Sequence, residues 1–537
     1  MNRATPLERW WPFAFVVLAY ACVALQQITL PGVYMDAVNP DYMAVRVLNP
    51  HGPPMLPWLL PGNWLFDRIP FMITFYHGSQ QAWLGLPFFW LFGTSVAGLR
   101  LTHAMFALAL LAALHAWLTR AGLRNWQAAL ACLALAVDPS FSYAFRTQSY
   151  ITLAPAAWLF FALYALWRAS DESARASWWR AAGGTFYAFA VIAYFIYGFF
   201  LPGMLLVALW VPFARGFART WMPLLAGAAI GPAVYALSYW LLARQVGGWA
   251  AALEYFESTQ RAINAFGNQA DFAARLSHLA ETVKSVFHNS YHHALIFGEY
   301  ADVPGAKYKM ALLLGAPLLI WLRLEWKRQS TAALRAMVAL ALSFCVVAFA
   351  FGTRLSGHHF MVLLPIAYAG LALGLARLAE LPTASRTGRW TVVIPLAALV
   401  ALNVGGQVKE GVRLHEVRGA GLYSDAINRL AADLDADPRK PVAYFPDWGL
   451  FMPVVFLTGG RVATHTTEDL STARESLCAG RDVAVPFITG DRSARIASWR
   501  EKLAWDPPDI TPYAQADGKV VFDLATFRGR RGGPGCG

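Results

Sequence analysis

Long apolar runs recur along most of this chain, and they restrict it to folds that a lipid bilayer can hold. A helix needs about 20 mostly apolar residues to cross the hydrocarbon core of a membrane. About eleven runs approach that length. They are residues 11–29, 100–118, 125–142, 150–167, 181–198, 201–214, 222–242, 310–323, 333–352, 358–377 and 390–406. Since 57% of the residues are hydrophobic and only 14% are charged, we predict an α-helical polytopic membrane protein with about 11 transmembrane helices.

The basic residues gather in short connections between the apolar runs. The net charge of +12 would suggest nucleic-acid binding in a soluble protein, but this clustering is typical of cytoplasmic loops. The clusters are Arg120/Arg124, Arg168/Arg175/Arg180, Arg215/Arg219, Lys327/Arg328/Arg335 and Arg377/Arg386/Arg389. We therefore expect no nucleic-acid partner and a multi-pass protein with a cytoplasmic N-terminus.

The run AWLGLPFFWLF, which begins at Ala82, decides the orientation of the later segments. It is only about eleven residues long and contains Pro87, so it is shorter than a normal span. If it crossed the membrane, every basic cluster would face outward, against the positive-inside rule. We therefore place this run in the membrane interface. The first apolar run lacks a clear cleavage site, so we expect an uncleaved signal anchor.

The chain changes character after residue 406, and we expect a transmembrane domain over 1–406 and an outer α/β domain over 407–537. From Ser424 or Asp425, which could cap a helix, short strand and helix patterns alternate, which indicates a small domain with a largely parallel sheet. No Gly-rich phosphate loop opens its helices, so a nucleotide site has little support. The five cysteines are too scattered for a zinc site, though Cys478 and Cys536 could pair.

Two carboxylates follow the first apolar run in the stretch YMDAVNPDYMAVRVLNP. Asp41 suits the N-cap of a short helix, and acids in an outer loop can simply be solvated. Asp36 follows the first span within about eight residues, at a depth where an ionised carboxylate needs a partner or a purpose. Asp36 is therefore the sharper functional candidate.

Three other predicted outer segments carry basic, amide and phenol groups. A histidine here could be structural and an arginine could simply extend from a helix end toward water. Together, however, such groups suit an anionic lipid headgroup, because arginine offers forked donors to phosphate and histidine adds hydrogen bonds. The residues are Tyr76, His77, Arg146, Gln148, Tyr150, Arg354, His358 and His359.

The order of these features resembles the GT-C superfamily of membrane glycosyltransferases, in the family of protein O-mannosyltransferases and bacterial aminoarabinose transferases. The resemblance is carried by the acidic first outer loop and by four later stretches. These stretches are LPFFWLFG, DPSFSYAFRTQSY, HHFMVLLP and PDWGLFMPVVFLTGGR. It covers most of residues 1–406 and, thinly, the remainder.

The resemblance implies roles for single residues. Asp36 matches the catalytic base, and Ala37 stands where relatives commonly have a glutamate, which leaves open whether Asp41 supplies a second carboxylate. His77 stands where relatives have a basic residue followed by prolines, and would contact the lipid phosphate. Arg146 falls near a turn that lines the active cavity. Arg354, His358 and His359 fall near a turn associated with the donor phosphate.

The implied activity is an inverting transfer of a sugar from a polyprenyl-phosphate donor to an acceptor hydroxyl, at the outer face of a bacterial inner (plasma) membrane. A glycan, a protein, lipid A or another lipid could be the acceptor, and membrane lipids surround the chain. No cofactor is firmly implied, but a divalent cation stays open, since DAVNPD is not an Asp-X-Asp motif and His358 and His359 are adjacent.

The strongest alternative is a polytopic transporter or lipid flippase with an outer accessory domain, and a further one is a non-catalytic assembly or sensor protein. A transporter should show inverted repeats and broken helices with ionisable groups at the midplane. None of these is evident in the sequence. We therefore expect an enzyme rather than a transporter.

Overall fold

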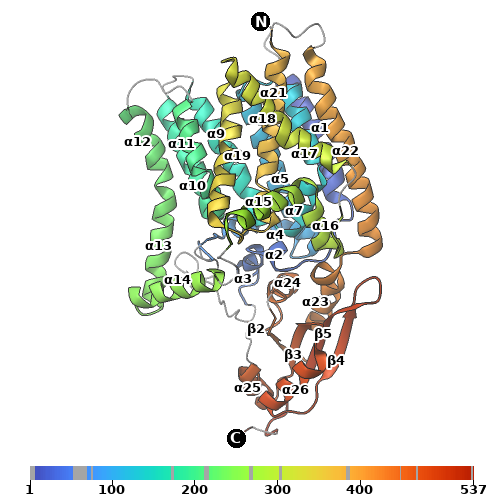
Figure 1. Cartoon of the computed structure of the whole chain (residues 1–537). Helices are drawn as coiled ribbons and strands as arrows, with labels where there is room; N and C mark the ends of the chain where they lie inside the picture. The colour runs from blue at the N-terminus through green and yellow to red at the C-terminus, as the bar shows by residue number, and fades with distance from the viewer. Residues whose placement is uncertain are drawn as a thin grey trace.

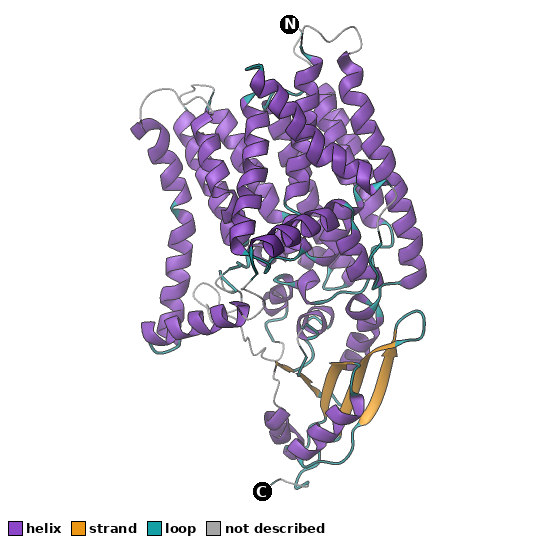
Figure 2. Cartoon of the chain, viewed as in Figure 1, coloured by secondary structure: helices purple, strands orange, loops and turns teal. Residues whose placement is uncertain are grey.

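The computed structural model joins a bundle of long helices to a small α/β domain, and the strands all lie in that domain (Figure 2). The N-terminus lies at one end of the bundle and the C-terminal domain projects from the other (Figure 1). The structure describes residues 6–51, 69, 71–73, 76–170, 175–210, 217–264, 270–301, 305–381, 388–447, 449–466, 470–533 and 536. Most of the Pro- and Trp-rich part of the predicted outer loop, residues 52–68, lies outside this range.

The helical part alternates long helices with short ones at the turns. In chain order the first group is α1 (Pro6–Leu25), α2 (Met35–Val38), η1 (Asp41–Ala44), α3 (Val45–Leu48), α4 (Gln80–Phe92), α5 (Val96–Arg120), α6 (Asn125–Ala136), α7 (Pro139–Thr147), α8 (Ser149–Thr152), α9 (Ala154–Ala169), α10 (Ala176–Ala193), η2 (Phe195–Phe200) and α11 (Leu201–Trp210). The second group is α12 (Phe217–Ala228), α13 (Ile230–Gln245), α14 (Trp249–Asn264), α15 (Phe272–Phe287), α16 (Ser290–Phe297), α17 (Ala306–Met310), η3 (Ala311–Gly315), α18 (Ala316–Trp326), α19 (Ala332–Phe351), α20 (Gly357–Phe360), α21 (Leu363–Ala379) and α22 (Gly388–Val417).

Each predicted span falls largely on one helix or on successive helices. Among the described residues, 6 helices are long and apolar enough to cross a membrane, or 7 if α6 and α7, bent by 58°, form one span. Two further apolar helices, Trp11–Leu25 and Phe195–Trp210, are shorter. The total of about 11 spans therefore stays a prediction, while the helical membrane fold is confirmed.

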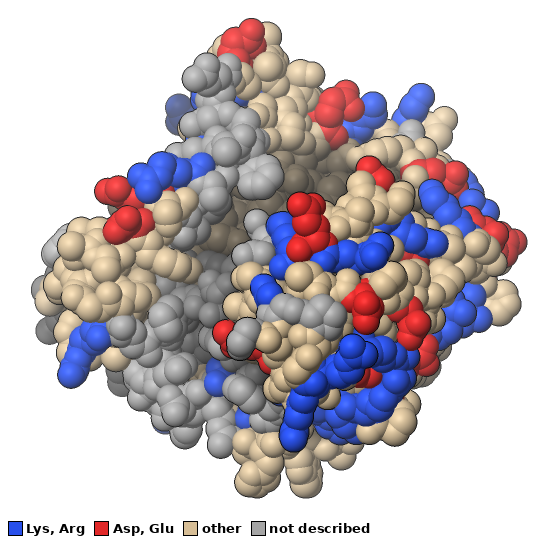
Figure 3. Space-filling model, turned by 90° about the horizontal axis from the view of Figure 1, so that it is seen from below, with Lys and Arg blue, Asp and Glu red and all other residues tan. Residues whose placement is uncertain are grey.

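The outside of the bundle is apolar, as a surface facing lipid must be. Large apolar side chains on five different helices are more than half exposed, and they include Phe15, Leu209, Leu319, Val346 and Ile394. In contrast, the lower end of the molecule, where the C-terminal domain lies, carries Lys and Arg beside Asp and Glu (Figure 3).

The helix ends that flank the basic connections, such as the end of α9 and the start of α12, lie at the end of the bundle away from the C-terminal domain (Figure 1). Two contacts hold such connections together there: Arg120 Nη2 donates to the Trp167 carbonyl at 3.3 Å, and Arg377 Nε donates to the Gln329 carbonyl at 3.0 Å. The two sides expected from the charge pattern thus correspond to the two ends of the bundle. Which end faces the cytoplasm stays a prediction.

A fully buried ion pair lies at the bend between α6 and α7. The Asp138 carboxylate accepts from the Ser140 amide at 2.8 Å, from Lys309 Nζ at 2.6 Å and from the Tyr368 hydroxyl at 2.7 Å. Asn403 donates to the same Tyr368 oxygen at 2.7 Å. Because the carboxylate is paired and hydrogen-bonded, its charge is tolerated away from water, and it ties α7, α17, α21 and α22 together. This broken helix was not expected from the sequence.

The C-terminal domain contains a five-stranded sheet in the order β2-β1-β3-β5-β4. Its strands are β1 (Val442–Phe445), β2 (Thr464–Thr466), β3 (Val483–Ile488), β4 (Asp509–Ala514) and β5 (Val520–Phe527). Its helices are η4 (Gly421–Tyr423), α23 (Ala426–Ala436), α24 (Phe451–Leu457), η5 (Leu470–Thr472), α25 (Ala473–Cys478) and α26 (Arg492–Leu503).

The expectation of a largely parallel sheet was wrong. Strand β1 is parallel to β2 and β3, but β5 is antiparallel to both β3 and β4. Strand β4 was not predicted, and a short turn joins it to β5, with Gly518 at φ +86°. A connection that short allows only antiparallel pairing, so the second half of the sheet differs from the first.

A disulfide and the start of α23 bear on two smaller predictions for this domain. A disulfide joins Cys478 and Cys536, which confirms that pairing. At the start of α23, the Ser424 hydroxyl accepts from the Ala426 amide at 3.2 Å, while the Asp425 carboxylate pairs with Arg418 at 2.7 Å. Of the two proposed caps, Ser424 is the one whose side chain bonds the helix.

The buried ion pair predicts a strong and specific effect on stability. Replacing Lys309 by Met leaves Asp138 charged and unpaired, which should cost about 3–5 kcal/mol and lower the apparent melting temperature of the purified protein. The control is Arg335→Met, because the Arg335–Glu325 pair is partly exposed and screened by solvent and should contribute only about 0–1 kcal/mol. Equal melting temperatures for the two variants would contradict the structural role of the pair.

Candidate active site

Two buried arginines hold the backbone that leads from α1 to Asp36. Arg100 of α5 donates to the carbonyls of Ile28 and Pro31 at 2.8 and 2.5 Å. Arg146 of α7 donates to the carbonyls of Leu30 and Gln26 at 2.9 and 2.5 Å. Backbone carbonyls past the end of a helix lack intrahelical partners, and these two side chains supply them.

This arrangement changes the expectation for Arg146. Its guanidinium is committed to the backbone after α1, so it has a supporting role in place of the expected contact with a phosphate. Arg100 was not singled out from the sequence, although a charged residue at the edge of an apolar run was a usable signal.

Asp36 lies half-buried in α2 and is hydrogen-bonded from α7–α8. Gln148 Nε2 donates to Asp36 Oδ2 at 3.2 Å, and the Tyr150 hydroxyl makes a longer contact to Asp36 Oδ1 at 3.5 Å. Burial raises the pKa of the Asp36 carboxyl above its usual value, and the hydrogen bonds from Gln148 and Tyr150 offset part of this rise. A carboxylate whose pKa is raised is a stronger base than an ordinary one.

The contacts continue from Gln148 to His358 and Tyr291. Gln148 Nε2 lies 3.1 Å from His358 Nδ1, and the Tyr291 hydroxyl lies 2.6 Å from the same atom. Since the amide nitrogen can only donate, His358 Nδ1 accepts, and the proton of the neutral ring is assigned to Nε2. Asp36, Gln148, His358 and Tyr291 therefore form one chain of polar contacts. Tyr291 was not predicted.

His77 and His359 lie with tyrosines beside this chain. The His77 ring centroid is 5.3 Å from that of Tyr150, and its backbone pairs with Tyr194 in an isolated bridge. The Tyr76 ring packs edge-on against Tyr194 at 6.1 Å. His359 Nδ1 lies within hydrogen-bonding distance of the Ser356 backbone, and its Nε2 lies 3.1 Å from the Tyr194 hydroxyl.

Burial lowers the pKa of His77 to about 3, so its imidazole is neutral at physiological pH. Removing the ring from water disfavours its charged form. The contact of His77 with a lipid phosphate, which the resemblance implies, stays a prediction.

Asp41 lies in a separate and fully buried pocket. Its Oδ2 accepts from His103 Nε2 and from Gln81 Nε2, both at 2.7 Å. Ser149 of α8 lies 3.1 Å from His103 Nε2, while its neighbours along the chain, Gln148 and Tyr150, contact Asp36. Asp41 therefore supports the helix that bonds Asp36.

The expectation that Asp41 caps a helix was wrong. Pro40 occupies the N-cap position of η1, and no side chain bonds the first amides of that helix. The carboxylate is instead directed into the bundle, where its partners come from α4 and α5.

Arg354 lies in the turn between α19 and α20. Its guanidinium stacks over the Phe351 ring at 5.4 Å, and Phe351 packs on Phe195, which neighbours Tyr194. Among the described residues, the buried Arg354 Nε has no hydrogen-bond partner. A guanidinium group offers forked donors that suit an anionic group.

Two concave regions flank the surface helix α15. An apolar groove between α18, α19 and α21 is lined by residues that include Val283, Leu313, Met337, Leu342 and Ile366. On the other side of α15, a polar cavity is lined by residues that include Thr282, Ser285, Tyr291, Tyr300 and Ser356. Tyr291 therefore connects the polar cavity to the chain of contacts that ends at Asp36.

Among the described residues, no three His, Cys, Asp or Glu side chains are grouped so that they could hold a metal ion. The groups that meet at Asp36 are instead one carboxylate, an amide, phenols and imidazoles.

The sequence matches no protein-family model and has no significant match among curated proteins. The structure is similar to ArnT from Cupriavidus metallidurans bound to undecaprenyl phosphate, with a TM-score of 0.55 and 13% identity over 97% of this chain and 98% of that chain. The apo state of the same protein matches with a TM-score of 0.54 and 14% identity, over 95% and 97% of the two chains. An oligosaccharyltransferase from Archaeoglobus fulgidus matches with a TM-score of 0.47 and 14% identity, over 92% and 72%.

Because the likeness to ArnT extends over nearly the full length of both chains, it includes the bundle and the C-terminal domain together. The chain therefore has the fold of the GT-C membrane glycosyltransferases.

Proposed function

We propose that the protein is an inverting glycosyltransferase, which moves a sugar from a polyprenyl-phosphate donor to an acceptor hydroxyl at the outer face of a bacterial inner membrane. The observation that carries the proposal is the half-buried carboxylate of Asp36, which Gln148 orients at the end of the bundle nearest the C-terminal domain. The fold adds support, because ArnT was solved with undecaprenyl phosphate bound.

In the proposed reaction Asp36 is the general base. The acceptor oxygen attacks the anomeric carbon, its proton passes to the Asp36 carboxylate, and the bond from that carbon to the phosphate oxygen breaks. The bonding electrons leave with the lipid phosphate. A positioned base contributes about 10²–10⁴-fold to such a reaction, and the hydrogen bond from Gln148 keeps one carboxylate oxygen in place.

The leaving phosphate needs donors, and the neighbouring turn offers them. Arg354 supplies the positive charge. His358 can donate from Nε2, because its Nδ1 accepts from Gln148, and the Tyr194 hydroxyl is a further group that can donate. Each preorganised donor can stabilise developing charge by about 3–4 kcal/mol. His77 and His359 add neutral imidazoles to the same site. The apolar groove beside α15 suits the isoprenoid chain.

A transporter or lipid flippase is the second candidate, because the bend between α6 and α7 and the buried Asp138–Lys309 pair are features also found in transporters. In that case movement of a lipid or ion across vesicles, and not covalent transfer, would depend on the protein.

The first test removes the base. Asp36→Asn should lower the rate of transfer by about 10²–10⁴-fold, measured with purified protein, a panel of radiolabelled polyprenyl-phosphate sugars and membrane extract as acceptor. Asp506→Asn, at an exposed carboxylate of the C-terminal domain, is the matched control and should retain full activity. Transfer by the Asp36 variant at the control rate would reject the base assignment, and transport without transfer by the wild type would favour the second candidate.

The second test uses pH. Asp36 must be deprotonated to act as a base, so kcat/KM should rise with pH through its pKa and level off above it. Because burial raises that pKa, the midpoint should lie above the value of about 3.9 for an ordinary aspartate. The raised pKa also means that ionised Asp36 disfavours the folded state as pH rises, so Asp36→Asn should melt no lower than wild type at neutral pH. A midpoint at or below the ordinary value would contradict this environment.

The third test separates Asp41 from Asp36. Asp41→Ala leaves the buried His103 Nε2 without its carboxylate partner and removes one of the hydrogen bonds of Gln81, so it should lower stability by about 1–3 kcal/mol, seen as a reduced melting temperature. An Asp41→Ala protein that melts like wild type but transfers no sugar would instead make Asp41 a second catalytic carboxylate.

A further inference from the structure

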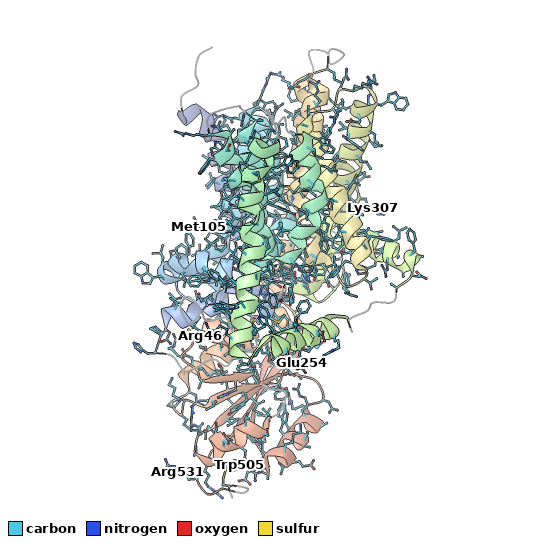
Figure 4. The ribbon with its side chains drawn as sticks, turned by 90° about the vertical axis from the view of Figure 1, so that its left-hand side faces the viewer. Arg46, Met105, Glu254, Lys307, Trp505 and Arg531 are labelled. Atoms are coloured by element: carbon cyan, nitrogen blue, oxygen red, sulfur yellow. A yellow bond between two sulfur atoms is a disulfide. The ribbon has the colours of Figure 1, made fainter. Side chains whose placement is uncertain are left out.

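The C-terminal domain meets the membrane bundle at the loop that carries Asp36. Buried residues of this loop and of α24 belong to one hydrophobic core. The Tyr42 ring packs edge-on against Phe451 at 5.9 Å, and Phe89 of α4 packs in the same way against Phe456 at 5.4 Å. Arg46 lies at the level where the C-terminal domain joins the bundle, whereas Trp505 and Arg531 lie at the end of the C-terminal domain farthest from the bundle (Figure 4).

Glycines of the C-terminal domain allow this contact to be unusually close. A Cβ atom added to Gly449 would lie 2.1 Å from the ring of Tyr34, and one added to Gly460 would lie 2.6 Å from Val45 Cγ1. Both glycines also have positive φ values, of +99° and +67°. Only glycine fits such positions without strain or displacement of the neighbour. The backbone at Gly449 therefore rests directly on Tyr34, two residues before Asp36.

An ion pair fixes the backbone beside Gly449. Arg495 of α26 donates to both oxygens of Asp447, at 2.9 and 2.7 Å, and the Ile488 amide donates to the same carboxylate at 2.7 Å. Asp447 follows β1 and Ile488 ends β3, so the carboxylate links the ends of two parallel strands. Such two-pronged pairs restrict geometry strongly.

The carboxylates of Asp36 and Asp447 both act on the Tyr34 hydroxyl. The pKa of Tyr34 is raised to about 12, first by burial and then by the nearby carboxylates of Asp36 and Asp447. Tyr34 is thus in reach of both the proposed base and the C-terminal domain.

We propose that Asp447 and Gly449 of the C-terminal domain are positioning residues for Asp36: Arg495 holds Asp447, and the backbone at Gly449 holds Tyr34 and thereby the loop that carries the base. The kinetic part of this inference rests on the proposed function, but the packing part does not. Since misplacing a reacting group by about 1 Å can cost about 10²-fold, loosening this contact should lower kcat and leave donor binding intact.

The experiment replaces Gly449 by Ala in the full-length protein. The matched control is Gly518→Ala, because Gly518 in the β4–β5 turn has a similar positive φ of +86° but no atom within 4 Å of an added Cβ. Three quantities are measured for each protein: hydrogen–deuterium exchange of residues 34–45, affinity for undecaprenyl phosphate, and kcat and KM with the active polyprenyl-phosphate sugar.

We expect Gly449→Ala to speed exchange across residues 34–45 and to lower kcat at least about ten-fold, with KM and the affinity for undecaprenyl phosphate within about two-fold of the Gly518→Ala values. A second pair of variants guards against misfolding of Gly449→Ala. Asp447→Asn weakens the pair with Arg495 without adding bulk. Asp509→Asn weakens the pair with Arg528, whose Nε and Nη2 both donate to Asp509 Oδ2 at the edge strand of the same sheet. Only Asp447→Asn should reproduce the loss in kcat.

Unchanged exchange in both Gly449→Ala and Asp447→Asn would overturn the proposal, and so would faster exchange with kcat at the control value. If the wild type transfers no sugar from any donor, the proposed function fails separately. Exchange across residues 34–45 then still decides whether the C-terminal domain holds this loop.

Discussion

The candidate site depends on the hydrogen bonds that Arg100 and Arg146 donate to the backbone after α1. Four carbonyls that would otherwise lie unpaired near the membrane surface are satisfied by two buried guanidinium groups. The chain leaves this clamp only five residues before Asp36, measured from Pro31. The place of the carboxylate is therefore set by donors that bond the backbone before Asp36 and not Asp36 itself.

Three layers surround Asp36, and each restricts it in a different way. The two arginines hold the start of the loop that carries Asp36, and the Gln148 amide bonds one carboxylate oxygen. The backbone of the C-terminal domain at Gly449 packs against Tyr34. Burial also affects His77, because removing the imidazole from water lowers its pKa and disfavours the charged form. Arg354, which is only partly buried, is therefore the proposed source of positive charge for an anion.

The membrane fold could be predicted because hydropathy over about 20 residues is a local property of the sequence. The partner of a single polar side chain is not a local property, so some of these contacts were predicted and others were not. Asp36 does contact Gln148 and Tyr150, and Gln148 in turn contacts His358, as the position of their turns suggested. Arg146 and Asp41 stand in equally plausible turns but face inward to other partners, and no sequence spacing distinguishes these directions. The antiparallel half of the sheet was missed because β4 carries Pro512 and alternates weakly.

Helix α22 is continuous from Gly388 to Val417, a run of 30 residues that contains Pro395 and ends four residues before the start of η4 in the C-terminal domain. At 1.5 Å per residue it is a rod about 45 Å long. A rod of this kind turns any change in the tilt of its membrane-embedded half into a displacement of whatever is attached to its far end. Because a hydrophobic stretch longer than the local hydrocarbon thickness can accommodate by tilting, we expect a thinner bilayer to be felt at the junction between this helix and the C-terminal domain.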